Sequence, residues 1–296
     1  PQVFIPYKEV LDLYDTGVEL PGDITLMWTD DNYGYIRRLS NEKEQARDGG
    51  SGVYYHLSYW GRPHDYLWLC TTQPGLIWYE MSRAWQNGAR TAWIVNVGDI
   101  KPAEYTMEFF LDLAWDTGMV NGQNIGRHLS DWAGREFGNA NTREIVGIME
   151  EYYRLAMLRK PEYMGWSRTE PTTGTEPTAF SIRANDNELQ RRIDYYKTLE
   201  KRTEKVKSRI PAGRMDAFFQ LVEYPVRCAA LMNYKFLRAQ QSFLAETSRE
   251  KEFYAKLSEK AFHEIETLTR HYNLNLSGGK WNHMMSMSPR DLPAFS

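Results

Sequence analysis

Three apolar segments, each ending in a polar cluster, decide the expected fold: ITLMWTDDN at residues 24–32, GVYYHLSYWGR at residues 52–62 and TAWIVNVGD at residues 91–99. Amphipathic sequence lies between them, and strands that alternate with helices predict a parallel sheet. In a β/α barrel, catalytic groups lie where the strands end and the following loops begin. The three polar clusters therefore predict three walls of one active site.

The first 117 residues are expected to form βα units. We count three strands, at 24–28, 53–57 and 92–96, and expect helices at residues 7–16, 36–46, 75–85 and 101–116. Pro102 is expected in the first turn of the last helix. A closed barrel needs eight strands, so these three strands belong either to a small open sheet or to the C-terminal part of a barrel. Because the sequence enters directly at a helix, we expect the second: the C-terminal βα units of a TIM-type barrel whose first strands are absent.

From residue 118 onward the strand patterns stop and helical patterns take over. Thr247 with Glu250, and Asn141 with Glu144, resemble capping boxes, and Pro225 is expected to kink or split a long helix. The expected helices are 124–137, 142–158, 188–209, 215–245 and 247–271. We therefore predict an α/β plus all-α chain: residues 1–117 as a partial barrel catalytic domain, and 118–296 as an antiparallel helical bundle with an irregular tail from residue 273.

The composition excludes some classes of protein. A formal net charge of −3 over 296 residues argues against a nucleic-acid binder, which is usually basic, and no apolar run is long enough to span a bilayer. The chain has ten Trp, nineteen Tyr and twelve Phe, which suit sugar rings or fill a large core. Its first residue is Pro1, not a methionine, which we interpret as a trimmed or excised chain, so the missing leader says nothing about secretion.

Carboxylates stand at two places where catalytic groups are expected. Asp30, Asp31 and Asn32 follow the first strand and could orient a water, bind sugar hydroxyls or hold a cation; a polar turn that caps the next helix is the alternative. Glu9 lies in the first turn of its helix, on the face where strands end, and could be an acid or base. Alternatively it complements the helix dipole.

The second cluster is rich in aromatic residues. Tyr54, His56 and Tyr59 lie at or just beyond the strand end, where a histidine could bind a sugar or move a proton. A histidine satisfied within the core is the alternative. Arg62 is a candidate clamp for a substrate carboxylate, or an ion-pair partner of Asp65.

Asn96 and Asp99 end the third strand. An asparagine there can bind a substrate hydroxyl, or can form the turn before Pro102. We find no nucleotide or metal signature: GGSG at 49–52 precedes a strand and has no lysine of a phosphate loop. His263 and His271 are not spaced as zinc ligands, so no cofactor and no metal are expected.

These segments together resemble glycoside hydrolase family 115, the xylan α-1,2-glucuronidases. The resemblance rests on TDDNYGYIRR at 29–38, GVYYHLSYWGRPHDY at 52–66 and VNVGD at 95–99. It implies removal of (4-O-methyl-)glucuronic acid from glucuronoxylan or aldouronic oligosaccharides, with inversion at the anomeric carbon. The helical second half fits the bundle that follows the barrel in that family.

The resemblance also implies roles for single residues. The family's active-site positions fall on Glu9 and Asp30, which are the catalytic candidates, and on the substrate-binding candidates Asn32, Tyr54, His56, Tyr59 and Asn96. Arg62 joins the second set through the clamp argument above. An inverting glycosidase uses an acid and a base roughly 6.5–9.5 Å apart, and the sequence does not assign the two roles.

Members of the family are much longer than this chain. We therefore expect the chain alone to be inactive or severely impaired. Two alternatives stay open: a non-catalytic carbohydrate-binding or assembly module with Trp60 and Trp68 on a flat face, and a homodimer through an exposed apolar stripe along 215–245. Because a plant polymer is met outside the cytoplasm, a secreted or periplasmic location is expected, without a membrane or nucleic-acid partner.

Overall fold

The computed structural model describes residues 2–61, 64–98, 100–165 and 176–286. The chain forms two compact units. Unit 1 consists of Pro1–Tyr59, Thr72–Gly98 and Tyr105–His128, and unit 2 of Trp60–Thr71, Asp99–Glu104 and Leu129–Ser296. The proposed domain division at residue 117 stays a prediction. Among the described residues, no helix is both long and apolar enough to cross a bilayer.

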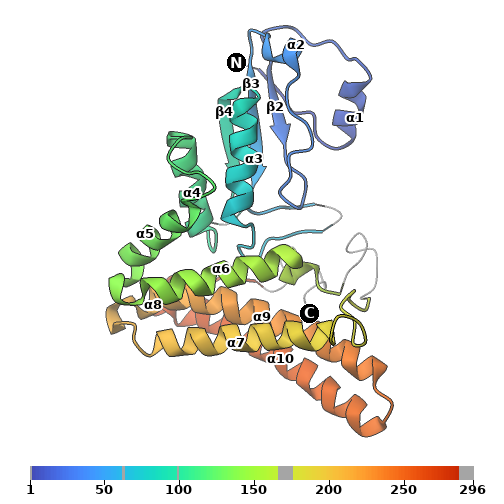
Figure 1. Cartoon of the computed structure of the whole chain (residues 1–296), viewed down its shortest axis with the longest axis vertical. Coiled ribbons are helices and arrows are strands. Elements are labelled where there is room, and N and C mark those ends of the chain that lie inside the picture. The colour runs from blue at the N-terminus through green and yellow to red at the C-terminus, as the bar shows by residue number, and fades with distance from the viewer. Residues whose placement is uncertain (1, 62–63, 99, 166–175, 287–296) are drawn as a thin grey trace. The chain divides into compact units, whose positions relative to one another are not determined.

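Unit 1 is built on a four-stranded parallel sheet with the strand order β1-β2-β3-β4 (Figure 1). The strands are β1 (Val3–Phe4), β2 (Thr25–Thr29), β3 (Ser51–His56) and β4 (Ala89–Asn96). The three predicted strands are confirmed. The fourth, β1, escaped prediction because two partly exposed residues carry no readable pattern. The sequence analysis expected the chain to enter directly at a helix. This is wrong, because β1 precedes α1.

Helices α1 (Glu9–Asp15), α3 (Pro74–Gln86) and α4 (Glu104–Trp115) follow the first, third and fourth strands, near their predicted positions. The helix predicted at 36–46 is wrong in its first half, since only α2 (Glu42–Gln45) is helical. The backbone of Ile36 is not helical, because it forms an antiparallel bridge with Asp30 and donates its N–H to the carboxylate of Glu80. Asn41 and Glu44 then start α2 with a capping box.

The prediction that Pro102 lies in the first turn of α4 is wrong. Pro102 follows a cis peptide bond after Lys101, and α4 begins two residues later at Glu104.

The sheet and its helices enclose an apolar core that includes Leu26, Trp28, Val53, Ile77 and Phe109. All but the last residue of β2 is buried, which is typical of a parallel strand between helical layers. At Gly52, a Cβ atom would collide with the carbonyl oxygen of Ala92, and the β3–β4 register shifts at this point. Glycine therefore allows β3 and β4 to approach closely just before the strands reach the polar clusters.

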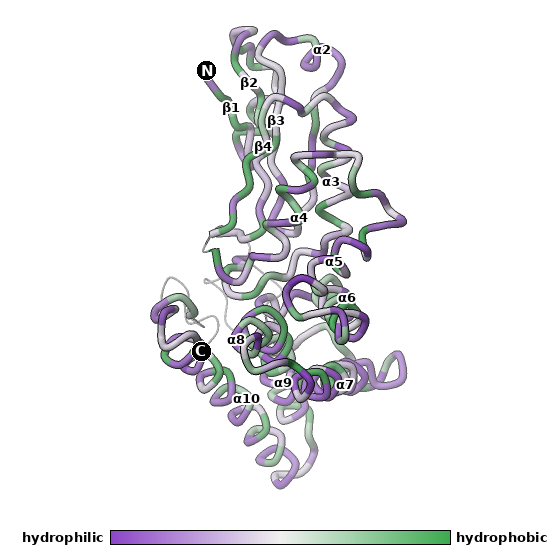
Figure 2. The backbone as a smooth tube through the Cα atoms, turned by 90° about the vertical axis from the view of Figure 1, so that its left-hand side faces the viewer, coloured by the Kyte–Doolittle hydropathy of each residue, from purple (hydrophilic) through white to green (hydrophobic). Residues whose placement is uncertain are grey.

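Unit 2 is helical. Its helices are the main part of α5 (Ile125–Phe137), α6 (Thr142–Leu158), α7 (Glu188–Lys207), α8 (Met215–Phe218), α9 (Tyr224–Leu244) and α10 (Ser248–Leu274). Helices α9 and α10 pack against each other along their length, and α7 lies beside α6 and α9 (Figure 1). Figure 2 shows hydrophobic and hydrophilic residues alternating along α10, as expected for a helix with one buried face.

Two predictions at helix starts have different outcomes. Thr247 and Glu250 form the predicted capping box of α10. Asn141 makes no side-chain cap on α6, because it belongs to a 3-10 turn (Asn139–Asn141) that leads into the helix. The segment 215–245 splits as expected near Pro225, where a π-helical turn (Phe219–Glu223) separates α8 from α9. Four βα units followed by helices confirm the predicted fold class.

Candidate functional site

The register of unit 1 brings the polar strand ends to one edge of the sheet. Thr29 of β2 is paired with Tyr54 of β3, and His56 of β3 with Asn96 of β4. Asp30, His56 and Asn96 therefore stand side by side at the carboxyl ends of three neighbouring strands. Open α/β sheets bind their ligands at this edge.

Asp30 and His56 form a buried pair at this edge. One carboxylate oxygen of Asp30 accepts hydrogen bonds from the backbone N–H of His56 at 3.1 Å and from its ring Nδ1 at 2.7 Å. The side chain of Asp30 is fully enclosed, and that of His56 is 10% exposed. Asp30 therefore fixes the orientation of the imidazole ring through Nδ1.

Burial raises the pKa of Asp30 to about 6, against the hydrogen bonds from His56, which lower it. The folded chain therefore binds more protons than the unfolded chain between about pH 4 and 6. Over this window the contribution of Asp30 to the free energy of unfolding decreases as the pH rises.

This shift predicts a pH effect on stability. Asp30→Asn should remove the loss of stability that Asp30 causes between about pH 4 and 6, because the amide does not titrate. Urea midpoints at pH 4, 5, 6 and 7 for the two proteins give the measurement. The same pH slope in both proteins would contradict the burial-raised pKa.

Three tyrosine rings surround His56. The ring centroids of Tyr54, Tyr59 and Tyr7 lie 4.9, 4.7 and 6.5 Å from that of His56. The hydroxyls of Tyr7 and Tyr59 are hydrogen-bonded to each other. Burial raises the pKa of Tyr59 to about 12, so this hydroxyl keeps its proton. The result is an aromatic wall with fixed hydroxyl groups, a surface that suits a sugar ring.

Asn96 orients one of these rings. Its side-chain amide donates to the Tyr54 hydroxyl at 2.9 Å, and its side-chain oxygen accepts from the backbone N–H of Gly98 at 3.0 Å. Its backbone carbonyl accepts from Leu57 at 2.8 Å. Asn96 thus fits both hypotheses from the sequence: it forms a turn through Gly98, and it places a polar group at the site through Tyr54.

Lys8 and Tyr7 are residues that sequence reasoning missed. Lys8 has a φ of 52° and a ψ of −123°, which is strained for a residue other than glycine. Its ammonium lies 5.1 Å from the ring centroid of Tyr7 and 5.8 Å from that of Tyr59. The strained backbone therefore directs a positive charge onto the aromatic wall. The following residue, Glu9, begins α1 and is exposed, so its carboxylate is open to solvent two positions from Tyr7.

Not every predicted site residue has the same surroundings. Asn32 is buried just beyond the end of β2. The carboxylate of Asp31 instead stabilises a turn, because it accepts hydrogen bonds from the backbone N–H groups of Tyr33 and Tyr35 and forms an ion pair with Arg37. This is the polar-turn alternative. Arg62 and Asp99 lie outside the described residues.

The structure also tests the flat aromatic face expected of a binding module. Trp68 is buried and donates its indole N–H to Tyr224, whereas Trp60 is 62% exposed. The two tryptophans do not form one exposed platform.

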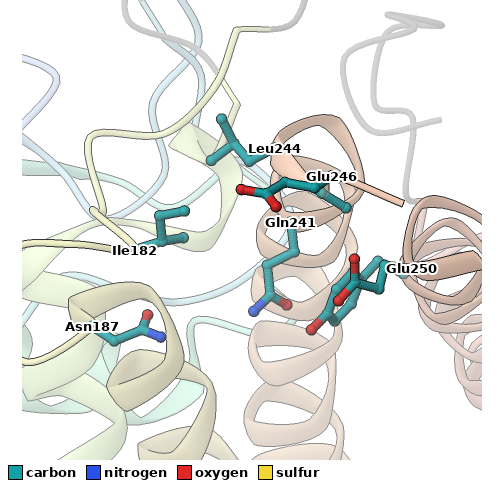
Figure 3. Close-up of a pocket in the computed structure, with 8 residues that line it drawn as sticks. Ile182, Asn187, Gln241, Leu244, Glu246 and Glu250 are labelled. Atoms are coloured by element: carbon teal, nitrogen blue, oxygen red, sulfur yellow. The ribbon is translucent and has the colours of Figure 1, made fainter. Parts of the chain in front are cut away.

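Unit 2 holds a pocket of about 310 Å³ near the end of α9 (Figure 3). Three of its polar residues already serve the fold. Asn187 caps α7, Glu250 caps α10, and Gln241 accepts from Arg238. The lining is Ile182, Asn187, Gln241, Leu244, Ala245, Glu246, Glu250 and Tyr254. This pocket offers no arrangement of groups that resembles a catalytic site.

Comparison with known families identifies the family to which the chain belongs. The model of glycosyl hydrolase family 115 matches residues 1–163, more than half of the chain. The chain belongs to glycosyl hydrolase family 115. A search of curated proteins found no match.

Among solved structures, the chain is similar to a family 115 enzyme, BtGH115A. That protein is described as a 4-O-methyl-α-glucuronidase with specificity for decorated arabinogalactans. The two share 47% sequence identity with a TM-score of 0.90, over 100% of this chain and 38% of BtGH115A. The family 115 chain described here thus corresponds to a part of that enzyme.

Proposed function

We propose that the edge of the unit 1 sheet is part of the active site of an α-glucuronidase, which releases (4-O-methyl-)glucuronic acid from a decorated polysaccharide with inversion. We call Lys8, Glu9, Asp30, Asn32, Tyr54, His56, Tyr59 and Asn96 the strand-end site. The observation that carries the proposal is His56, which is held by the buried Asp30 within a wall of tyrosines at the catalytic edge of a βα sheet.

The surroundings of the two carboxylates suggest different roles. Glu9 is exposed and can reach a substrate or a water, so we assign it to one of the two carboxylate roles of an inverting glycosidase. Asp30 is enclosed and bonded to His56. We therefore assign Asp30 as a positioning residue that orients His56 toward the sugar.

Lys8 supplies the charge that a uronic acid requires. A glucuronate carries a carboxylate at neutral pH, and the Lys8 ammonium lies against the aromatic wall on which the sugar ring would pack. We infer that Lys8 binds this carboxylate. The carboxylate clamp predicted from sequence at Arg62 stays a prediction.

The substrate is a polysaccharide with glucuronic acid side groups. The sequence resemblance favours glucuronoxylan, and the relative BtGH115A is described as specific for decorated arabinogalactans. Because such polymers are met outside the cytoplasm, we propose a secreted or periplasmic site of action. The sheet of unit 1 is open, with four strands where a closed barrel has eight, so the chain alone is expected to be severely impaired.

The test compares two proteins. One is this chain, and the other is a chimaera in which this chain replaces the matched 38% of BtGH115A. Uronic acid release is measured on glucuronoxylan and on glucuronidated arabinogalactan, with undecorated xylan as the control. Release by the chimaera supports the proposal, and the preferred polymer identifies the substrate. A folded chimaera that releases no uronic acid from either polymer would contradict it.

The charge of Lys8 gives a prediction for the same assay. In the chimaera, Lys8→Met should raise KM for the uronide about 10-fold or more, because a hydrogen bond to a charged group is typically worth about 1.5–3 kcal/mol. Lys8→Arg should retain most of the affinity. Equal KM values for all three proteins would show that Lys8 does not bind the carboxylate.

The binding-module alternative has less support, because Trp68 is buried.

The apolar face of α9 is mostly buried, with exposed apolar residues at Phe243 and Leu244. A homodimer through the helices stays a prediction.

A further inference from the structure

Three metal-ligating side chains of unit 1 converge at a place that the strand-end site does not use. They are Glu108 and Asp112 of α4 and His128 near the start of α5. One donor atom from each lies within 4.8 Å of the other two. The sequence shows no metal motif here because the histidine follows sixteen residues after Asp112.

The fold prepares these groups in two ways. Glu108 and Asp112 are one helical turn apart and thus share a face of α4. The ring of His128 is held between aromatic neighbours, edge-on to Phe109 at 5.0 Å and tilted against Tyr105 at 5.8 Å between centroids. The side chain of His128 is only 11% exposed, so its ring has little freedom to turn away.

The orientation of the histidine defines which atom can bind. Nε2 faces a carboxylate oxygen of Asp112 at 3.1 Å. Nδ1 is buried and has no hydrogen-bond partner among the described residues. The ring therefore presents one nitrogen, and it does so toward the carboxylates. Asp112 has a side-chain exposure of 46%, so an ion can enter from solvent.

A simple histidine–carboxylate pair is the plain alternative, and the chain contains one for comparison. His263 pairs with Glu266 on α10, with the ring 61% exposed. The cluster on α4 and α5 differs from that pair in three respects: a second carboxylate, a nearly enclosed imidazole, and donors from two helices.

We propose that Glu108, Asp112 and His128 bind a divalent transition metal of the zinc class. One nitrogen and two carboxylate oxygens are ligands that Zn²⁺ accepts, with solvent in the fourth position. Bonds of about 2.1 Å place tetrahedral donors roughly 3.4 Å apart. The His128–Asp112 pair, at 3.1 Å, already has about this spacing, and the other pairs, which lie within 4.8 Å, need to close by no more than about 1.4 Å. The ion would tie α4 to the start of α5.

The test is zinc binding by the metal-stripped chain, followed by calorimetry and by thermal unfolding with and without ZnCl₂. We expect one bound equivalent and a raised unfolding midpoint. Asp112→Asn and His128→Gln should each weaken binding at least about 10-fold, and His263→Gln, the matched control, should leave it unchanged. Asp112 is half exposed, so its variant keeps the fold even if the His128 variant does not.

Several outcomes would overturn the proposal. These are no zinc bound by the wild-type chain at about 100 μM free metal, affinity unchanged in both cluster variants, or an equal loss in the His263 control. Binding of Mg²⁺ in preference to Zn²⁺ would contradict the assignment to a transition metal.

Discussion

Replacing Asp30 with asparagine is expected to lower uronic acid release by the chimaera about 10²-fold, because a small misplacement of a group that positions the substrate typically costs this much. The carboxylate of Asp30 holds the Nδ1 proton of His56 and its backbone N–H. An amide can present its NH₂ group to the ring, which favours the wrong tautomer. The loss should fall on kcat, and the pH profile should shift, because a positioning residue acts on the reacting state.

The adjacent residue offers a matched control. Asp31→Asn changes the same atoms one position along, but that carboxylate serves only the turn at 33–37 in the contacts observed. It should reduce release by less than about 10-fold, since the amide keeps an oxygen for the N–H groups of Tyr33 and Tyr35 and an ion pair to the exposed Arg37 contributes little. An equal loss in both variants, or full activity of Asp30→Asn, would contradict the role assigned to the Asp30–His56 pair.

Replacing Glu162 with alanine is expected to destabilise unit 2 by at least about 3 kcal/mol. The buried carboxylate accepts hydrogen bonds from the backbone N–H groups of Leu67, Trp68 and Leu69 at 3.1, 2.5 and 3.2 Å. Removing the acceptor leaves the buried N–H groups of Trp68 and Leu69 and the partly buried N–H of Leu67 unsatisfied. Each buried donor without a partner costs about 1–3 kcal/mol. The free energy of unfolding from urea titration gives the measurement.

The control keeps the acceptor and removes the charge. Glu162→Gln retains a side-chain oxygen for the three N–H groups. Burial raises the pKa of Glu162, so lowering the pH to 6 favours the neutral form of the side chain, which the amide resembles. We expect a loss of no more than about 1 kcal/mol there. Similar losses in the alanine and glutamine variants would show that the hydrogen bonds do not carry the stability.

The long, periodic elements were predictable because each is specified by its own residues. The apolar run of β2, the Gly-bounded run of β3 and the stripes of α6 and α7 carry their pattern locally. The elements that failed depend on tertiary partners. Ile36 reads as helical, yet Glu80, forty-four residues later, accepts its backbone N–H and keeps it extended.

The strand-end site was partly predictable for the same reason. Parallel register follows from the βα rhythm, so Asp30, His56 and Asn96 could be placed at one edge before any distance was known. Lys8 could not be found in this way, because a positive φ at lysine leaves no mark in the sequence. The convergence of Glu108, Asp112 and His128 is equally hidden, since it depends on how α4 and α5 pack.

The most direct test of the central claim is a crystal structure of the chimaera with 4-O-methylglucuronate. We predict the sugar at the strand-end site, with its carboxylate on Lys8, its ring against Tyr54 and Tyr59, and His56 within hydrogen-bond distance of it. An empty strand-end site with the sugar bound elsewhere, for instance in the pocket between Asn187 and Glu250, would contradict the assignment.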